Sequence, residues 1–457
     1  MPLQKNQVLT LRVERLSSDG SGVAHSPDGE TVFIPGAAPG DEARVRIVKD
    51  CKRYAFGILD EVLTPSPDRI PVDCAVAGPC GGCSLRHLDY AAELRAKQEN
   101  VADAFARIGG LDVPVLPIVG SPEVNRYRNK VQFPVGVDKS GKPCIGFYAG
   151  RTHRIVPCPD CRLQPGVLNE IGNALCAFFA EKGIQPYSEE TGRGLVRHIF
   201  LRRGAHSGQI MVCLVCTRAR LPYAEELCTR LKAQFAEITT ILLNVNAKNT
   251  NVILGTETHT LYGPGYIEDT LCGVPVQLGP LSFYQVNTLA AEQLYGIATQ
   301  YAQLTPDDLL LDLYCGMGTI GLSMAAHCRE LIGVEIVPEA IESAKANAAR
   351  MGADVAAKSR FFCADAGQAA TRLAAEGLHP DIVMLDPPRK GCDEATLSAV
   401  VRMSPRRVVY VSCNPATAAR DAAWLEQNGY HAEKVQPVDL FPRTRHVEAI
   451  VSLQREI

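Results

Sequence analysis

The sequence predicts an α/β protein whose C-terminal part is a doubly wound, Rossmann-like sheet, preceded by a small N-terminal β-barrel and a central α+β region. From about residue 280, buried-strand runs alternate with helical segments, which is the pattern of a doubly wound parallel sheet. Residues 6–63 instead hold several short strand-like runs separated by glycine-rich turns, as in a small barrel. The 457 residues and the hydrophobic fraction of 46% fit a globular chain with a sizeable core.

Three domains are expected along the chain. Residues 1–64 form an OB-like barrel, and Thr64-Pro65-Ser66-Pro67 has the composition of a linker. Residues 65–275 form the central domain, in which a helix over 89–108 is expected to end at two glycines. Residues 276–457 hold the doubly wound sheet, with strands expected at 309–313, 331–335, 381–385 and 408–412 and a helix at 338–351.

No membrane or export signal is found in the sequence. No apolar run is long enough to cross a bilayer, and residues 1–10 lack the apolar core of a signal peptide. We therefore expect a cytoplasmic protein without a membrane partner.

Charge is informative only locally. The net charge of −3 does not by itself indicate a nucleic-acid partner. Two stretches, 126–130 and 193–203, are basic with few acidic residues. The first places Tyr127 between cations, which suits phosphate contact and base stacking, although an ordinary ion-paired surface has the same composition.

Three of the 17 cysteines are closely spaced in the central region. Cys74, Cys80 and Cys83 form the pattern Cys-x5-Cys-Gly-Gly-Cys, which predicts a metal or cluster site. A fourth ligand must come from elsewhere, and Cys158 and Cys161 are both candidates. Spacing alone allows tetrahedral zinc or a cubane iron–sulfur cluster. Most of the other cysteines are expected to be buried thiols.

The C-terminal region carries the signature of a nucleotide-type cofactor site. Asp312-Leu313-Tyr314-Cys315-Gly316-Met317-Gly318 is a strand ending in a glycine-containing turn. Glu335 ends the next strand and can accept both ribose hydroxyls of an adenosine, and Asp365 follows a third strand, where it can contact the adenine. The glycine pattern would also permit a dinucleotide dehydrogenase. Asp386-Pro387-Pro388-Arg389 opposes that alternative, because it is typical of S-adenosylmethionine sites that face a planar base.

A reactive cysteine is predicted in Ser412-Cys413-Asn414-Pro415. Cys413 directly follows a buried strand, where a catalytic group is expected in this architecture, and the Asn-Pro sequence after it is unusual for a buried packing position. Glu448, in His446-Val447-Glu448, is a candidate proton acceptor, although neighbouring arginines also allow a surface ion pair.

Two residues before the first cofactor strand are further candidates. Phe283 can stack on a base that has left its helix, with core packing as the alternative. Gln285 can bind the cofactor.

These motifs together resemble the RNA 5-methyluridine methyltransferase family. The resemblance rests on Phe-x-Gln-x-Asn at 283–287, the glycine turn at 312–318, Asp-Pro-Pro-Arg at 386–389, Ser-Cys-Asn-Pro at 412–415 and His-Val-Glu at 446–448, in that order. It covers about the last 180 residues with specific motifs. More loosely, residues 6–63 resemble the TRAM barrel, an RNA-binding module of the ribosomal-RNA members that the usual tRNA members lack.

The resemblance implies a mechanism and a set of roles. Cys413 is the nucleophile that adds to carbon 6 of uracil, carbon 5 then takes the methyl group of S-adenosylmethionine, and Glu448 is the base that removes the carbon 5 proton. Gln285, Tyr314, Glu335 and Asp386 fall on cofactor positions; position 319 is Thr, where some members carry Asn. The resemblance also favours a [4Fe–4S] cluster over zinc, with Cys161 as its fourth ligand. Because the cysteine spacing is not the Cys-x3-Cys-x2-Cys of radical enzymes, we expect a structural or RNA-positioning cluster with no redox step in methylation.

The expected substrate is 23S ribosomal RNA, bound by a monomer without any DNA partner. One alternative is a tRNA methyltransferase that acts on the thymidine loop. Another is a catalytically silent RNA-binding protein, against which Cys413, Glu448 and Asp386 argue because a binding module has no need of them.

Overall fold

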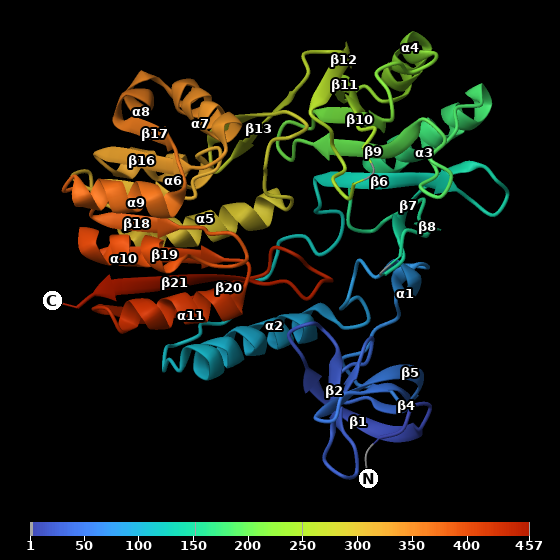
Figure 1. The fold of residues 1–457 in the computed structure, drawn as a ribbon, viewed down its shortest axis with the longest axis horizontal. Helices are drawn as coiled ribbons and strands as arrows, with labels where there is room; N and C mark the ends of the chain where they lie inside the picture. Colours follow the sequence, from blue (N-terminus) through green and yellow to red (C-terminus); the bar gives the residue numbers. More distant parts are fainter. Residues whose placement is uncertain (1–2, 151, 249, 457) are drawn as a thin grey trace.

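The computed structural model describes residues 3–150, 152–248 and 250–456. It consists of a barrel, a central sheet and a C-terminal sheet, which occupy separate parts of the molecule (Figure 1). The predicted α/β fold class, with its N-terminal barrel and its doubly wound C-terminal sheet, is confirmed. The domain boundaries expected at 64/65 and 275/276 stay predictions.

The N-terminal strands close into a five-stranded barrel in the order β1-β2-β3-β5-β4. Buried and exposed residues alternate along β4, as a strand with one face on a core requires. Val32, Ile34, Val45 and Ile47 fill the interior. The strands are β1 (Val8–Leu16), β2 (Gly22–His25), β3 (Thr31–Ile34), β4 (Glu42–Asp50) and β5 (Tyr54–Thr64).

The central region contains a seven-stranded sheet in the order β12-β11-β10-β9-β6-β7-β8. All seven residues of β10 are buried, and α3 and α4 pack into the same core. The sequence did not predict this order, which mixes one parallel pair with antiparallel pairs. The elements are β6 (Lys130–Val137), β7 (Pro143–Tyr148), β8 (Ile155–Pro157), α3 (Gly166–Lys182), β9 (Val196–Arg203), β10 (Ile210–Cys216), α4 (Ala224–Gln234), β11 (Ile238–Val245) and β12 (Glu257–Tyr262).

The helix expected over 89–108 is present and belongs to the C-terminal core. Asp89 caps α2 (Tyr90–Ala104) by accepting a 2.9 Å hydrogen bond from the Ala92 backbone. A π-helical turn, Phe105–Gly109, continues it and ends at Gly110, whose φ of +63° suits glycine. The helix lies beside α11 (Pro415–Glu426) (Figure 1). A short helix, α1 (Ala77–Cys80), precedes it in the cysteine-bearing loop.

The C-terminal sheet has the order β17-β16-β15-β18-β19-β21-β20. Its first five strands are parallel, and β21 runs antiparallel to both of its neighbours, β19 and β20. The strands are β15 (Leu309–Leu313), β16 (Glu330–Glu335), β17 (Ser359–Cys363), β18 (Ile382–Leu385), β19 (Arg407–Ser412), β20 (Tyr430–Val438) and β21 (Glu448–Arg455), and a hairpin of β13 (Ile267–Leu271) and β14 (Val274–Leu278) precedes them.

Helices cover both faces of this sheet. The order turns back between β15 and β18, and in such sheets ligands bind at the carboxyl ends of the strands beside that point. Among the described residues, no helix is both long and apolar enough to cross a membrane. The helices are α5 (Thr288–Ala302), α6 (Thr319–Met324), α7 (Pro338–Met351), α8 (Ala353–Lys358), α9 (Ala366–Ala375) and α10 (Glu394–Met403), in addition to α11.

Candidate active site

Strand pairing brings Cys413 and Glu448 together. In the antiparallel pair of β19 and β21, Ser412 lies opposite Ala449. Cys413 follows Ser412, and Glu448 precedes Ala449. Cys413 and Glu448 therefore meet at the carboxyl edge of the sheet. Asp386 follows the neighbouring strand β18 at the same edge. Three residues that lie up to 62 positions apart in the sequence thus form one group because of the sheet order.

The Cys413 thiol lies between acidic groups and one arginine. Burial raises the pKa of Cys413, and the nearby Glu448 and Asp386 carboxyls raise it further. The Arg389 side chain opposes this shift by hydrogen bonding to the sulfur and by its positive charge. Arg389 is the last residue of the Asp-Pro-Pro-Arg motif, and the sequence alone assigned it no role of its own.

The two carboxyl groups of the edge are placed for proton exchange near neutral pH. Burial raises the pKa of Glu448 to about 8, with a further increase from Asp386 and an opposing effect of Arg389. Burial also raises the pKa of Asp386 to about 7. A carboxyl with a pKa close to the working pH can accept a proton and release it again within one cycle. Glu448 is buried, which contradicts the alternative of a surface ion pair.

The candidate cofactor residues lie on the turns that follow β15, β16 and β17. The Glu335 carboxylate accepts hydrogen bonds from the backbone N–H groups of Gly316, Ile336 and Val337, at 3.1, 2.9 and 3.0 Å. These contacts fix its orientation beside the glycine turn. Tyr314 has a φ of +70°, and its hydroxyl lies 3.5 Å from that of Thr396. The Asp365 carboxylate caps α9 through the Gln368 backbone at 3.1 Å.

Two further buried residues lie beside the cofactor candidates: Tyr295, which the sequence did not single out, and Asp312, which opens the predicted glycine motif but was assigned no role of its own. The Tyr295 hydroxyl lies 3.4 Å from that of Thr319 and also contacts Gln285. Asp312 accepts a 3.0 Å hydrogen bond from the Gly321 backbone, and burial raises its pKa to about 8. The apolar face of α5 gave no signal that distinguishes Tyr295 from ordinary core.

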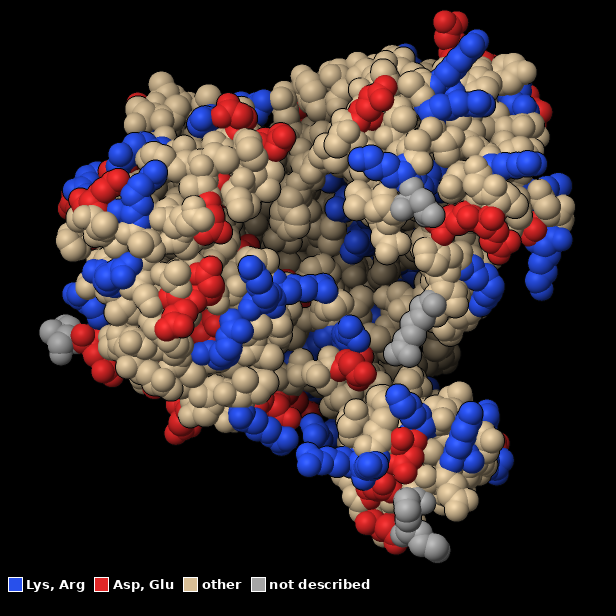
Figure 2. Space-filling view, viewed as in Figure 1, with Lys and Arg blue, Asp and Glu red and all other residues tan. Residues whose placement is uncertain are grey.

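Phe283 projects into a cavity. Its side chain is 72% exposed, so core packing, the alternative reading of this residue, is wrong. The cavity has a volume of about 530 Å³, and its walls include Gln285, Arg389 and His446. Figure 2 shows the molecule hollowed between its C-terminal and central parts, with Lys and Arg side chains in the depth of the hollow. The volume is sufficient for a nucleotide-sized ligand.

The cysteine-bearing loops form another wall of the same cavity. Cys74, Cys80, Cys83, Cys158 and Cys161 all line it. A hydrogen bond from the Cys158 thiol lowers the pKa of Cys161 to about 7, despite the opposing effect of burial. No set of three or more His, Cys, Asp or Glu side chains that can hold a metal ion is present within residues 3–150, 152–248 and 250–456.

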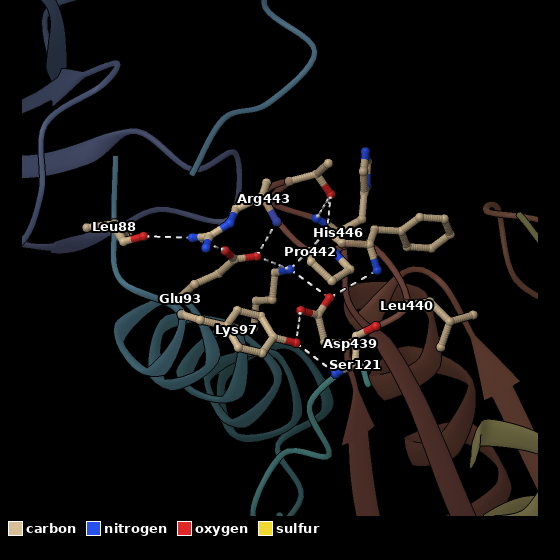
Figure 3. A network of polar contacts seen from close by, with 12 residues as sticks. Leu88, Glu93, Lys97, Ser121, Asp439, Leu440, Pro442, Arg443 and His446 are labelled. Atoms are coloured by element: carbon tan, nitrogen blue, oxygen red, sulfur yellow. Dashed lines mark hydrogen bonds and ion pairs between the residues drawn. The ribbon is translucent and has the colours of Figure 1, made fainter. Parts of the chain in front are cut away.

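A buried polar network holds the loop that precedes Glu448 (Figure 3). The Lys97 ammonium on α2 donates to Glu93 at 2.7 Å, to Asp439 at 2.8 Å and to the Phe441 carbonyl at 3.1 Å. The Arg443 backbone donates to the same Glu93 carboxylate at 2.7 Å. The loop 439–446 contributes Phe441, Thr444 and His446 to the cavity wall. The sequence gave no sign of this network, because its partners lie more than 340 residues apart.

Two family models match the ends of the chain. The one described as tRNA (Uracil-5-)-methyltransferase matches residues 274–456, and the one described as TRAM domain matches residues 2–59. An uncharacterized RNA methyltransferase of Halalkalibacterium halodurans is 43% identical over 454 residues, which cover 99% of this chain and 98% of the relative. Another, of Listeria monocytogenes serovar 1/2a, is 42% identical over 455 residues with the same coverage of both chains, 99% and 98%.

One solved structure is similar over almost the whole chain. It is Pyrococcus abyssi tRNA (uracil-54, C5)-methyltransferase in complex with S-adenosyl-L-homocysteine, with a TM-score of 0.77 and 26% sequence identity. The alignment covers 98% of this chain and 100% of the archaeal one. The likeness therefore includes the barrel as well as the two sheets.

Proposed function

The chain belongs to the RNA (uracil-5-)-methyltransferase family and is an S-adenosylmethionine-dependent enzyme of that class, and on this premise we propose that it methylates a uridine of 23S ribosomal RNA through a covalent adduct on Cys413. The observation that carries the proposal is the group formed by Cys413, Arg389 and Glu448 at the edge of the sheet. A protein that only binds RNA has no need of a thiol held between a cation and a buried carboxyl.

In the proposed reaction, Arg389 stabilises the Cys413 thiolate, whose sulfur adds to carbon 6 of the uracil. The electrons of the carbon 5–carbon 6 double bond form an enolate. Bound S-adenosylmethionine would supply the methyl group to carbon 5, with its sulfonium–methyl bond breaking and S-adenosylhomocysteine leaving. Glu448, in its ionised form, then takes the proton from carbon 5. The double bond forms again as the carbon–sulfur bond breaks, which returns the thiolate.

We assign the cofactor to the turns beside this group. Glu335 would accept the ribose hydroxyls, and Gln285, Tyr314 and Asp386 would contact the remainder of the molecule, with Asp365 at the adenine. Phe283 would stack on the target base, which must leave its helix before a thiol can reach carbon 6. The exposure of Phe283 in the cavity supports this role.

The ribosomal substrate rests on the resemblance of residues 6–63 to the TRAM barrel of the ribosomal-RNA members, and a TRAM family model matches residues 2–59. The thymidine loop of tRNA is a second candidate, because the archaeal protein that is similar over 98% of this chain is named a tRNA (uracil-54, C5)-methyltransferase. The barrel alone does not separate the two substrates, since that protein aligns with it as well.

We also propose that Cys74, Cys80, Cys83 and Cys161 hold a [4Fe–4S] cluster with a structural role, zinc being the alternative. Arg86 supports this assignment. Its side chain is buried among these cysteines, and its Nε and Nη2 have no hydrogen-bond partner among the residues described. The sulfur atoms of an anionic cluster would accept from both. Metal analysis of anaerobically purified protein decides this point, because zinc without iron or labile sulfide would contradict the cluster.

The deciding experiment supplies labelled S-adenosylmethionine with undermodified ribosomal RNA and, separately, with tRNA. We expect label in 5-methyluridine from ribosomal RNA, resolved by mass spectrometry of the nucleosides. Label from tRNA alone would keep the chemistry and overturn the substrate. Cys413→Ala should abolish transfer while the protein still binds the cofactor, whereas the matched Cys228→Ala should transfer normally. Normal transfer by Cys413→Ala would overturn the adduct mechanism.

A further inference from the structure

The cavity beside Phe283 has an unbalanced charge. Its walls contain five cationic side chains, Arg86, Arg128, Lys130, Arg162 and Arg389, and no Asp or Glu. A partly buried cation without a counter-charge costs free energy, and an anion in the cavity would offset this cost for any cation of the wall that has no partner in the protein. The charges of this cavity therefore indicate an anionic ligand.

Three of the five cations already have partners. Arg86 donates to Asp73 at 2.7 Å, and Arg162 lies 3.5 Å from the same carboxylate. Arg389 contacts the Cys413 sulfur. Arg128 and Lys130 differ, because neither side chain has a hydrogen bond or a carboxylate partner within the described residues. Both are half-buried.

The backbone holds Arg128 and Lys130 in place without using their side chains. The Arg128 N–H donates to the Leu163 carbonyl at 2.9 Å, which ties it to the cysteine loop. The intervening Asn129 donates from its backbone to Val286 and from its side chain to the Gln285 carbonyl, both at 2.8 Å. Because the segment is extended, residues 128 and 130 share one face of it and residue 129 lies on the other. Two cations are thus fixed on the same wall as Phe283.

The surroundings of Lys130 favour an external anion over the proposed cluster. Burial and the neighbouring Arg202 and Arg128 lower the pKa of Lys130 to about 8. No cysteine is among the charged groups that act on Lys130, whereas Cys161 acts on Arg128. A phosphate would restore the pKa and remove the repulsion between the two side chains.

We propose that Arg128 and Lys130 bind a backbone phosphate of the RNA directly beside the flipped uridine. This inference rests on the proposed function, because it takes the base stacked on Phe283 to be the target. Phosphate contacts fix the register of a nucleic acid without reading its sequence. The pair would hold the strand while the base enters the site.

The test neutralises single phosphates in an RNA fragment that the wild-type protein methylates. Methylphosphonate is placed at one linkage at a time around the modified uridine, and binding is measured with each fragment. Methylphosphonate at one linkage next to the uridine should weaken RNA binding to the wild-type protein by about tenfold to a hundredfold. For the variant Arg128→Gln/Lys130→Gln, the same methylphosphonate should lower the RNA affinity by less than about threefold, because the phosphate contact is already lost.

The salt dependence of binding gives a second readout. The slope of log affinity against log salt should become shallower by about 0.7 in Arg128→Gln/Lys130→Gln, which is the value for one neutralised phosphate of single-stranded RNA. The matched variant Lys182→Gln/Arg230→Gln removes two ion-paired surface cations of α3 and α4 and should keep the wild-type slope.

Three outcomes would overturn the phosphate site. Wild-type sensitivity to every methylphosphonate in Arg128→Gln/Lys130→Gln would do so, as would an unchanged salt slope. Loss of iron from that variant with unchanged RNA affinity would assign the cations to the cluster instead. A wild-type protein that methylates neither ribosomal RNA nor tRNA would remove the proposed function itself, which is a separate result.

Discussion

At the scale of single residues, Glu448 links catalysis to stability. Its pKa is raised to about 8 by burial, so between its ordinary value and pH 8 the folded protein holds a proton that the unfolded chain releases. The free energy of unfolding therefore falls as pH rises through this window. Glu448→Gln cannot ionise and should be more stable than the wild type at pH 9, by at least about 1 kcal/mol, with a smaller difference at pH 5.

Denaturant unfolding at the two pH values measures this difference. The same variant should accumulate the covalent RNA adduct, because the step that needs the base is blocked, whereas wild-type turnover should rise with pH up to about 8. If the stability gain of Glu448→Gln is equal at both pH values, the pKa of Glu448 does not differ between the folded and the unfolded protein. An adduct that resolves at the wild-type rate would remove it from the role of base.

Arg389 should control the reactivity of Cys413. Its hydrogen bond and charge oppose the effect of burial, so Arg389→Gln should raise the pKa of the thiol. The pH profile of alkylation at Cys413, followed by mass spectrometry of its peptide, should shift upward by about one unit, and Arg389→Lys should restore part of the shift. Cofactor affinity should stay unchanged. An unchanged profile in Arg389→Gln would mean that the thiolate is stabilised by another group.

At the scale of elements, the buried network makes α2 part of the catalytic domain. Lys97 is 2% exposed and lies between Glu93 and Asp439, neither of which is exposed. Lys97→Met would remove the cation that two buried carboxylates share, leaving Glu93 with only Arg443 at 3.6 Å and Asp439 without an ion-pair partner among the described residues. We expect a loss of roughly 3–5 kcal/mol in the free energy of unfolding. Lys345→Met, which breaks the exposed pair with Glu342, should cost less than about 1 kcal/mol.

The double variant Glu93→Gln/Lys97→Met should recover part of the free energy of unfolding that Lys97→Met loses, because it also removes one of the two buried carboxylates. Denaturant unfolding of the single and double variants measures this coupling. Equal costs for Lys97→Met and Lys345→Met would mean that the network does not stabilise the fold.

The same network shows what the sequence could and could not predict. The helix over 338–351 was predicted with its bounds, because proline at the start and glycine after the end mark them locally. Cys413 and Glu448 were found as separate motifs. Their contact depends on the antiparallel pairing of β19 and β21, which no local pattern encodes. Lys97 on an amphipathic helix likewise has no local signal for a partner 342 residues away.

At the scale of the whole molecule, backbone hydrogen bonds connect three segments that border the hollow. The Arg126 and Arg128 N–H groups donate to the carbonyls of Arg162 and Leu163, directly after Cys161. The Asn129 N–H then donates to the carbonyl of Val286, next to Gln285. The proposed cluster is thus connected through residues 126–130 to the loop that carries Phe283.

Loss of the cluster should therefore loosen the RNA-binding wall and leave the cofactor sheet intact. Cys161→Ser removes one proposed ligand, and we expect lower iron content together with faster hydrogen exchange in residues 126–130 and 283–288. Strands β15 and β18 lie in the buried core and should exchange at the wild-type rate. RNA affinity should fall more than cofactor affinity. Full iron content in Cys161→Ser would overturn the ligand assignment, and iron loss without faster exchange would mean that the cluster does not support this wall.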